Sequence, residues 1–190
     1  MSFPKIKRLD KPNLMKKNTF NLLFTFFSIF ILTSNCFSQT VDFSGAKIVC
    51  FEKDNKLVLR SVSIFQEEIK NKCDIMLPVT KKLSEKFQNV IFIGFENDLI
   101  KLPEEYRNIL SKMESTGNEG YKIVVSKDPN AALIIGHDPR GVLYGVGKLL
   151  RKMELRKTQL LVPEDLKIAS TPQYPIRGHQ LGYRPKTNAY

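Results

Sequence analysis

The residues suited to acid–base chemistry are two acidic pairs and one histidine–aspartate pair. Glu67-Glu68 and Glu104-Glu105 could supply carboxyl groups to a hydrolytic site, and His137-Asp138 could form an acid–base couple. Both acidic pairs fall in segments with helical periodicity, where adjacent side chains point about 100° apart, so we expect solvated surface carboxylates. We expect His137 to end a strand and Asp138 to cap the helix that follows it.

A glycine-rich stretch could in principle hold phosphate through its backbone amides. A P-loop has four residues between its glycines and a Ser or Thr after its lysine. Here five residues separate Gly141 from Gly147, and Leu149 follows Lys148. Leu150 stands where a dinucleotide-binding fingerprint has its third glycine. Because the stretch fails both motifs, we expect neither nucleotide nor cofactor binding.

Composition argues against metal and nucleic-acid sites. The 190 residues include two histidines and three cysteines, whose spacing matches no zinc motif. Residues 1–38 hold six basic residues and one acidic residue, so the net charge of +11 falls to +6 beyond them. The remaining cations are scattered and do not alternate with aromatic residues. Cys50 and Cys73 could pair in an oxidising compartment, but cysteines in apolar runs are more often small core residues.

Apolar periodicity predicts strands and helices along residues 46–162. The expected strands and extended segments are 46–51, 74–79, 89–95, 121–125, 131–136 and 159–162. The expected helices begin at Asp54 or Asn55, near Pro103, and at Asp138 with Pro139 in the first helical position. Glycines in the last helix cost roughly 1 kcal/mol each relative to Ala. We expect close approach of the helix backbone to a sheet to offset that cost.

This order of elements predicts an α+β fold, in which a mixed β-sheet is covered mainly on one face by two principal helices. The predicted domain comprises residues 39–163. Residues 163–175 contain three prolines together with charged and polar residues. We therefore interpret residues 164–176 as a linker.

The first 38 residues have the features of a signal peptide. Lys16 and Lys17 precede the apolar run 20–32, and small residues follow it. A helix of this run would span about 20 Å, short of the roughly 30 Å hydrocarbon core, so a transmembrane helix is the lesser interpretation. We favour cleavage before Gln39, although Cys36 in a loose lipoprotein box could become a lipid anchor. The chain is expected to be exported, either periplasmic or secreted.

Two motifs carry a family resemblance. Glu119-Gly120-Tyr121 precedes two strands, and Arg140-Gly141-Val142-Leu143-Tyr144-Gly145-Val146 with Leu149-Leu150 follows them. This order resembles the non-catalytic α/β domain that precedes the barrel in family 20 β-N-acetylhexosaminidases and, in related form, in family 67 α-glucuronidases. The resemblance covers about residues 45–185. It implies that residues 39–163 are an accessory domain and that 177–190 begin a truncated (β/α)8 barrel with its first strand.

The resemblance also suggests substrate-binding residues. In family 20 an Arg-Gly opens the first barrel strand, and Tyr174-Pro175-Ile176-Arg177-Gly178 looks like that junction. By position Arg177 would contact sugar hydroxyls, with a solvent-facing linker arginine as the alternative. His179 would point to the same side of a strand and could join it.

The residues after this junction depart from the hexosaminidase pattern. Gly182 and Tyr183-Arg184-Pro185 stand where hexosaminidases place an aspartate and an arginine. Because of this departure, related hydrolases that act on uronic-acid or other plant polysaccharides fit the sequence equally well.

The resemblance implies the N-terminal accessory part of an exported glycoside hydrolase that acts in polysaccharide or glycan breakdown. The family's catalytic carboxylates lie further along the barrel, so we expect no catalytic residue and no activity in this chain alone. A carbohydrate would bind through the barrel, with no nucleic acid and no membrane unless Cys36 is lipidated. The alternative is a stand-alone secreted carbohydrate-binding module. A small basic membrane-surface protein is weaker, since no basic cluster adjoins the apolar run in the sequence.

Overall fold

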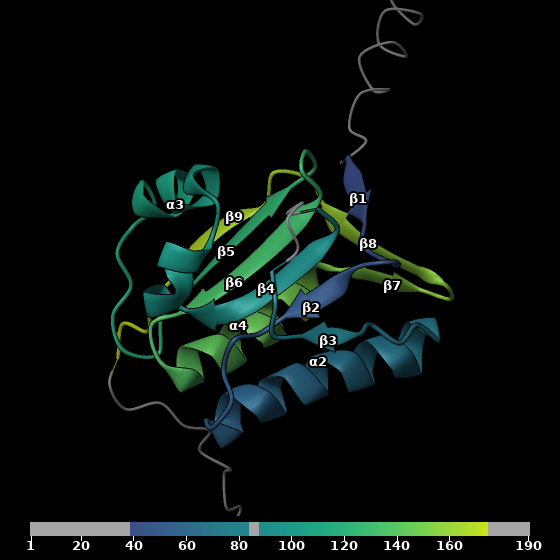
Figure 1. Ribbon diagram of the computed structural model, residues 1–190, viewed down its shortest axis with the longest axis horizontal. Helices are drawn as coiled ribbons and strands as arrows, with labels where there is room; N and C mark the ends of the chain where they lie inside the picture. The colour runs from purple at the N-terminus through teal and green to yellow at the C-terminus, as the bar shows by residue number, and fades with distance from the viewer. Residues whose placement is uncertain (1–38, 84–87, 175–190) are drawn as a thin grey trace, which may run out of the picture. The chain divides into compact units, whose positions relative to one another are not determined.

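The computed structural model describes residues 39–83 and 88–174 (Figure 1). These residues belong to one compact unit that begins at Gln39. In the described part, six strands form a mixed sheet in the order β3-β2-β4-β6-β5-β9, and three form a second sheet in the order β1-β8-β7. The expected α+β fold is confirmed.

The main sheet has a parallel part and an antiparallel part. It consists of β2 (Lys47–Val49), β3 (Val79–Thr80), β4 (Val90–Phe95), β5 (Tyr121–Ser126), β6 (Ala131–Gly136) and β9 (Lys167–Ser170). Strand β2 runs parallel to β3 and β4, and β4 runs parallel to β6, whereas β5 is antiparallel to β6 and β9. The central strands β4 and β6 are almost wholly buried, which explains their nearly continuous apolar sequences.

The second sheet contains β1 (Thr40–Asp42), β7 (Glu154–Arg156) and β8 (Gln159–Pro163). The predicted strand 159–162 is present, but it belongs to this sheet and not to the main one. Strands β1 and β7 were not predicted, because three residues are too few to show a period.

The main sheet extends into the predicted linker. Strand β9 lies within residues 164–176 and pairs with β5, with Ile168 opposite Ile123. The linker was predicted to begin at 164, yet the sheet continues to Ser170. Strand β9 was missed because it contains two apolar residues and is flanked by prolines. It forms by pairing with β5, which is a long-range contact.

Both principal helices begin where a capping side chain was predicted. Helix α2 (Lys56–Cys73) has Asn55 as its N-cap, whose Oδ1 accepts from the backbone N of Leu57 at 3.1 Å and of Val58 at 3.2 Å. Helix α4 (Pro139–Lys152) has Asp138 as its N-cap and Pro139 in its first turn. None of the described helices is long and apolar enough to cross a membrane.

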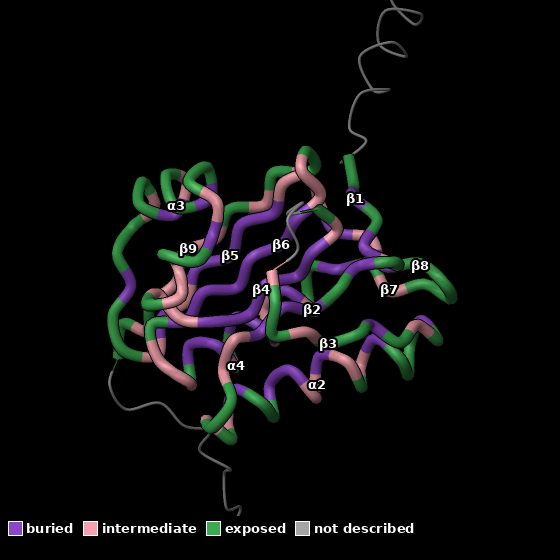
Figure 2. The backbone as a smooth tube through the Cα atoms, viewed as in Figure 1, coloured by how far each residue is buried: buried purple, intermediate pink, exposed green. Residues whose placement is uncertain are grey.

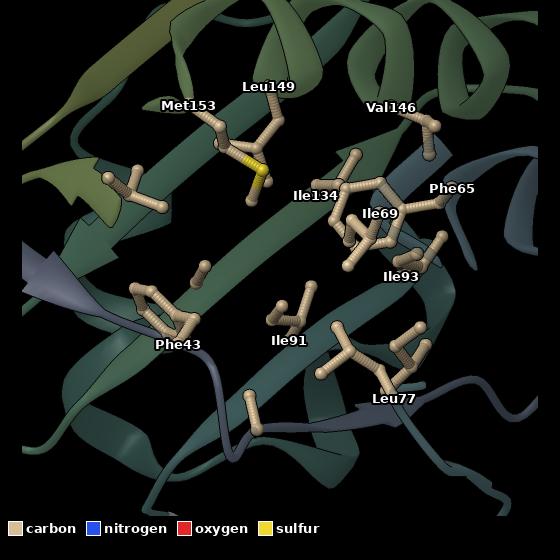
Figure 3. Packing of buried hydrophobic residues seen from close by; sticks show 14 of the residues in the cluster. Phe43, Phe65, Ile69, Leu77, Ile91, Ile93, Ile134, Val146, Leu149 and Met153 are labelled. Atoms are coloured by element: carbon tan, nitrogen blue, oxygen red, sulfur yellow. The ribbon is translucent and has the colours of Figure 1, made fainter. Parts of the chain in front are cut away.

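Helices α2 and α4 cover one face of the main sheet, as predicted. Figure 2 shows the buried stripe of each helix turned toward the sheet. Their buried side chains, including Phe65, Ile69, Val146 and Leu149, pack on the sheet residues Ile91, Ile93 and Ile134 (Figure 3). Phe43, in the loop after β1, closes the same cluster and is fully buried.

The other face carries a smaller layer. The 3-10 helix η2 (Glu96–Lys101) and helix α3 (Glu104–Ser111) follow β4. Tyr106 and Leu110 of α3 pack against Phe92, Val124 and Leu133, which point away from the principal helices. Because both clusters are formed by residues 41–162, the unit that begins at Gln39 contains its own core.

Several predictions fall outside the described residues. These are the signal peptide 1–38 with Cys36, and the barrel start 177–190 with Arg177 and His179. Cys50 and Cys73 are described: both are buried in the core and unpaired, and burial raises the pKa of each thiol.

Tyr106 provides a spectroscopic test of the smaller layer. Its hydroxyl donates to the carbonyl of Pro129 at 3.3 Å, and burial raises its pKa to about 12. In an alkaline absorbance titration we expect one tyrosine to ionise near pH 12, well above the ordinary value of about 10. The free energy of unfolding should fall as the pH rises from about 10 to about 12, because over this range the phenol ionises in the unfolded chain and stays protonated in the folded one. Tyr106→Phe should remove the late step, and a wild-type titration without that step would contradict the packing.

Candidate functional site

The candidate site is the edge of the main sheet at which its parallel strands end. We call it the carboxyl edge; it comprises the residues that follow β2, β4 and β6, the loop 115–120, and residues 171–174. Helices α2 and α4 begin here, and β9 ends here, with Ser170 paired to Tyr121. In open α/β sheets, ligands bind preferentially outside the carboxyl ends of the strands.

Asp138 joins the start of α4 to the loop 115–120. Its Oδ1 accepts from the backbone N of Gly141 at 2.8 Å, and its Oδ2 accepts from the backbone N of Glu119 at 2.6 Å. The backbone N of His137 donates to the carbonyl of Gly120 at 2.9 Å. Arg140 completes the junction through an ion pair of 2.7 Å with Glu119. The predicted capping role of Asp138 is confirmed, and it extends to a second segment.

Glycines make this junction possible. A Cβ on Gly141 would lie 2.1 Å from the carbonyl oxygen of Gly120. A Cβ on Gly145 would lie 2.7 Å from Ile134 of β6 and 3.3 Å from Tyr121 of β5. The predicted close approach is therefore confirmed at Gly141 and Gly145. It is wrong for Gly147, where a Cβ would meet only the Arg151 side chain at 3.4 Å.

A second polar cluster surrounds Glu96, directly after β4. Its Oε2 lies 3.6 Å from His137 Nδ1, and its Oε1 lies 3.7 Å from Lys122 Nζ. Thr116 Oγ1 donates to the same Oε1 at 3.4 Å. Lys122, with a side chain 10% exposed, also donates to the carbonyl of Leu110 at 3.4 Å. The cluster thus ties η2, α3, β5 and the end of β6 together.

This cluster differs from the sequence-based pairing. His137 contacts Glu96, which is 41 residues away, whereas its neighbour Asp138 faces the helix start. Sequence reasoning missed both Glu96 and Lys122. The available signal was a lysine one residue into an otherwise apolar strand, because a lysine is almost never buried without a partner.

Several acidic groups of the described region are engaged in structural interactions. Asp138 and Glu119 organise the start of α4, and Glu96 joins three elements. Glu67 pairs with Arg60 at 2.8 Å, and its hydrogen bond from Ser63 lowers its pKa. Glu104 and Glu105 lie exposed in the first turn of α3, where the helix dipole favours acidic groups. Both acidic pairs are surface groups, as predicted.

Two open depressions lie side by side along the carboxyl edge, sharing Asn118 and Glu119. The larger, of about 570 Å³, lies between the starts of α2 and α4, beside Asn55 and Arg140. The smaller, of about 350 Å³, is lined by Thr171, Gln173 and neighbouring residues. The described part of the chain contains no group of three or more His, Cys, Asp or Glu side chains that could hold a metal ion. This edge therefore offers polar hydrogen-bonding groups over a shallow surface.

The remaining site predictions have different outcomes. Arg177 and His179 lie outside the described residues, so their contact with sugar stays a prediction. Tyr121 is half-buried against the principal core. Tyr144, on α4, is 38% exposed.

No protein-family model matches the sequence, and no curated protein matches it. Several solved structures do. The described fold is similar to part of several glycoside hydrolases. A GH20 β-N-acetylhexosaminidase from Streptomyces coelicolor A3(2) aligns over 73% of this chain and 25% of its own, with 16% identity and a TM-score of 0.48. The Streptomyces plicatus N-acetyl-β-hexosaminidase aligns over 73% and 24%, with 15% identity and a TM-score of 0.48.

A family GH115 4-O-methyl-α-glucuronidase aligns over 68% of this chain and 18% of its own, with 11% identity and a TM-score of 0.48. The chain therefore spans a quarter or less of the length of these three enzymes. At such identities and TM-scores, nothing about activity or substrate follows from the similarity.

Substitution of the helix glycines tests the junction. We expect Gly141→Ala to lower the free energy of unfolding by at least about 3 kcal/mol, since the added Cβ would collide with a backbone oxygen. Gly147→Ala is the matched control on the same helix, and it should raise stability by about 0.5–1 kcal/mol. Urea denaturation followed by circular dichroism measures both. Equal effects of the two substitutions would show that Gly141 does not approach Gly120.

Removal of the cap tests the junction from its polar side. Asp138→Ala should cost about 2 kcal/mol, because it leaves the backbone N–H groups of Gly141 and Glu119 without acceptors. Asp138→Asn keeps one oxygen acceptor and should cost less than half as much. Urea unfolding of the two variants beside wild type provides the comparison. Two variants of equal stability would contradict the two-sided role of this carboxylate.

Proposed function

We propose that the chain is the N-terminal accessory part of an exported glycoside hydrolase that acts on polysaccharide or glycan. Residues 1–38 would direct export, and the unit that begins at Gln39 would be the accessory α/β domain. The catalytic carboxylates would belong to the barrel that begins at residue 177. In this proposal the domain stabilises and positions the barrel and performs no hydrolysis itself.

One observation carries the proposal: the two motifs of the sequence resemblance form a single packed unit. Glu119-Gly120-Tyr121 and Arg140-Gly141 are about 20 residues apart, yet Arg140 pairs with Glu119 and Gly141 packs on Gly120. A contact as short as that between Gly141 and Gly120 allows no side chain. The shared sequence pattern therefore has a physical reason in this junction, which supports a common domain.

The course of the chain gives further support. Strand β9 ends at the carboxyl edge, and residues 171–174 line the smaller depression there. The sequence then continues into Tyr174-Pro175-Ile176-Arg177-Gly178, which resembles the start of the family's barrel. We propose that the carboxyl edge faces the barrel. Arg177 and His179 would bind sugar hydroxyls from the first barrel strand, since a guanidinium offers a planar set of donors.

The first test is to sequence the genomic DNA beyond the Tyr190 codon and to express the reading frame that it contains. We expect an in-frame continuation that includes paired acidic residues at strand ends, and a product that cleaves aryl glycosides. The chain of residues 39–190 should not cleave them. In the longer protein, Arg177→Ala should raise KM or lower kcat/KM by about 10- to 100-fold, the loss of about 1.4–3 kcal/mol of sugar binding.

Two results would overturn this proposal. A stop codon directly after Tyr190, together with glycan-array binding by residues 39–190, would establish the stand-alone binding module instead. Glycosidase activity of residues 39–190 would show that the catalytic groups lie in this chain. Mass spectrometry of the mature N-terminus tests export separately, with Gln39 expected first and a lipidated Cys36 as the other outcome.

A further inference from the structure

Exposed cations gather at the end of the molecule opposite the carboxyl edge. Helices α2 and α4 both end there, beside the hairpin between β7 and β8. We call this surface the basic end; its cations are Lys70, Lys72, Arg151, Lys152, Arg156 and Lys157, all of them exposed. The sequence does not reveal this grouping, because the six residues lie on segments more than 75 residues apart.

The fold fixes the elements of the basic end next to one another. The backbone N of Thr158, in the hairpin turn, donates to the carbonyl of Cys73 at 2.7 Å, which holds the turn against the end of α2. Figure 1 shows the hairpin and the end of α2 side by side. Helix α2 also contacts both α4 and β7. Arg151 and Lys152, in the last turn of α4, therefore lie on the same surface.

Most of these cations are not neutralised. Lys72 pairs with Glu68 at 3.2 Å, and Arg156 pairs with Glu154. Among the described residues, Lys70, Arg151, Lys152 and Lys157 have no carboxylate within ion-pair distance. Asp74, at the C-cap of α2, is the third carboxylate here. Six cations and three carboxylates leave an excess of three positive charges.

Helix stability accounts for only part of this charge. Lysine and arginine in a last turn favour the negative end of the helix dipole, which explains Lys70, Lys72, Arg151 and Lys152 individually. It does not explain the cations of the hairpin, which lie on a turn and at its rim. Like charges brought together repel, so a shared anionic partner is the simplest compensation.

We propose that the basic end is a contact surface for an anionic lipid bilayer, in which its cations bind phosphate headgroups. Helix ends and a hairpin turn present charge outward, as a planar anionic surface requires. The depressions of the carboxyl edge, which a polymer chain could follow, lie at the opposite ends of the helices and are lined by other residues. A bilayer therefore fits better than an acidic polysaccharide or a nucleic acid.

Vesicle co-sedimentation tests this surface without the apolar run. The chain that begins at Gln39 is mixed with vesicles of phosphatidylcholine, either alone or with phosphatidylglycerol. We expect binding to the anionic vesicles only, and its loss in about 1 M salt, where the Debye length is about 3 Å. The variant Arg151→Gln, Lys152→Gln, Lys157→Gln should bind on the order of 100-fold more weakly, since each cation near a surface contributes about fivefold.

The matched control is Lys53→Gln, Lys56→Gln, Lys112→Gln. It removes the same charge from exposed positions away from the basic end, and it should keep nearly all the binding. Circular dichroism confirms the folding of each variant. Equal losses in the two variants would overturn the proposal, because binding would then follow net charge alone. Retention on polygalacturonate or heparin without vesicle binding would also overturn it, in favour of an anionic polymer.

Discussion

The contact between Gly141 and the carbonyl oxygen of Gly120 is the constraint on which the rest of the domain depends. It brings α4 down onto β5 and β6, so that Val142, Val146 and Leu149 enter the principal core. Helix α2 packs beside α4 on the same face of the sheet. A side chain at Gly141 would lift one end of this layer, and close-packed interiors do not absorb such a shift.

Much of the fold could be predicted because the decisive signals are local. Caps such as Asn55 and Asp138 act within four residues, and the buried faces of α2 and α4 follow a regular period. Strand β7 pairs locally with β8, but its three residues are too few to show a period. Strands β1 and β9 could not be predicted, because they are short and form by pairing with distant segments. The same reason applies to Glu96 and Lys122, whose meeting depends on the order of strands in the sheet.

The carboxyl edge shows how one group can serve a fold in two ways. Asp138 caps a helix, and the same carboxylate anchors a loop from another part of the chain. Glu96 similarly receives three side chains from three elements. Charged groups in such arrangements fix the relative positions of the segments that they join, because moving any segment leaves a polar group unsatisfied. In the function proposed above, the edge would hold the neighbouring barrel at a defined orientation.

The pairing of β1 with β8 determines when this domain can be completed. Ser44 accepts through its Oγ from the backbone N of Leu160 at 2.9 Å, across 116 residues, and Phe43 is sealed into the core by the same strand. A chain that leaves the ribosome or a membrane pore with its N-terminus first must keep its opening strand unpaired until almost the whole domain has emerged. Closing so long a loop is slow. Strand β1, the first strand of the domain to emerge, thus stays unprotected by pairing until β8 has followed it.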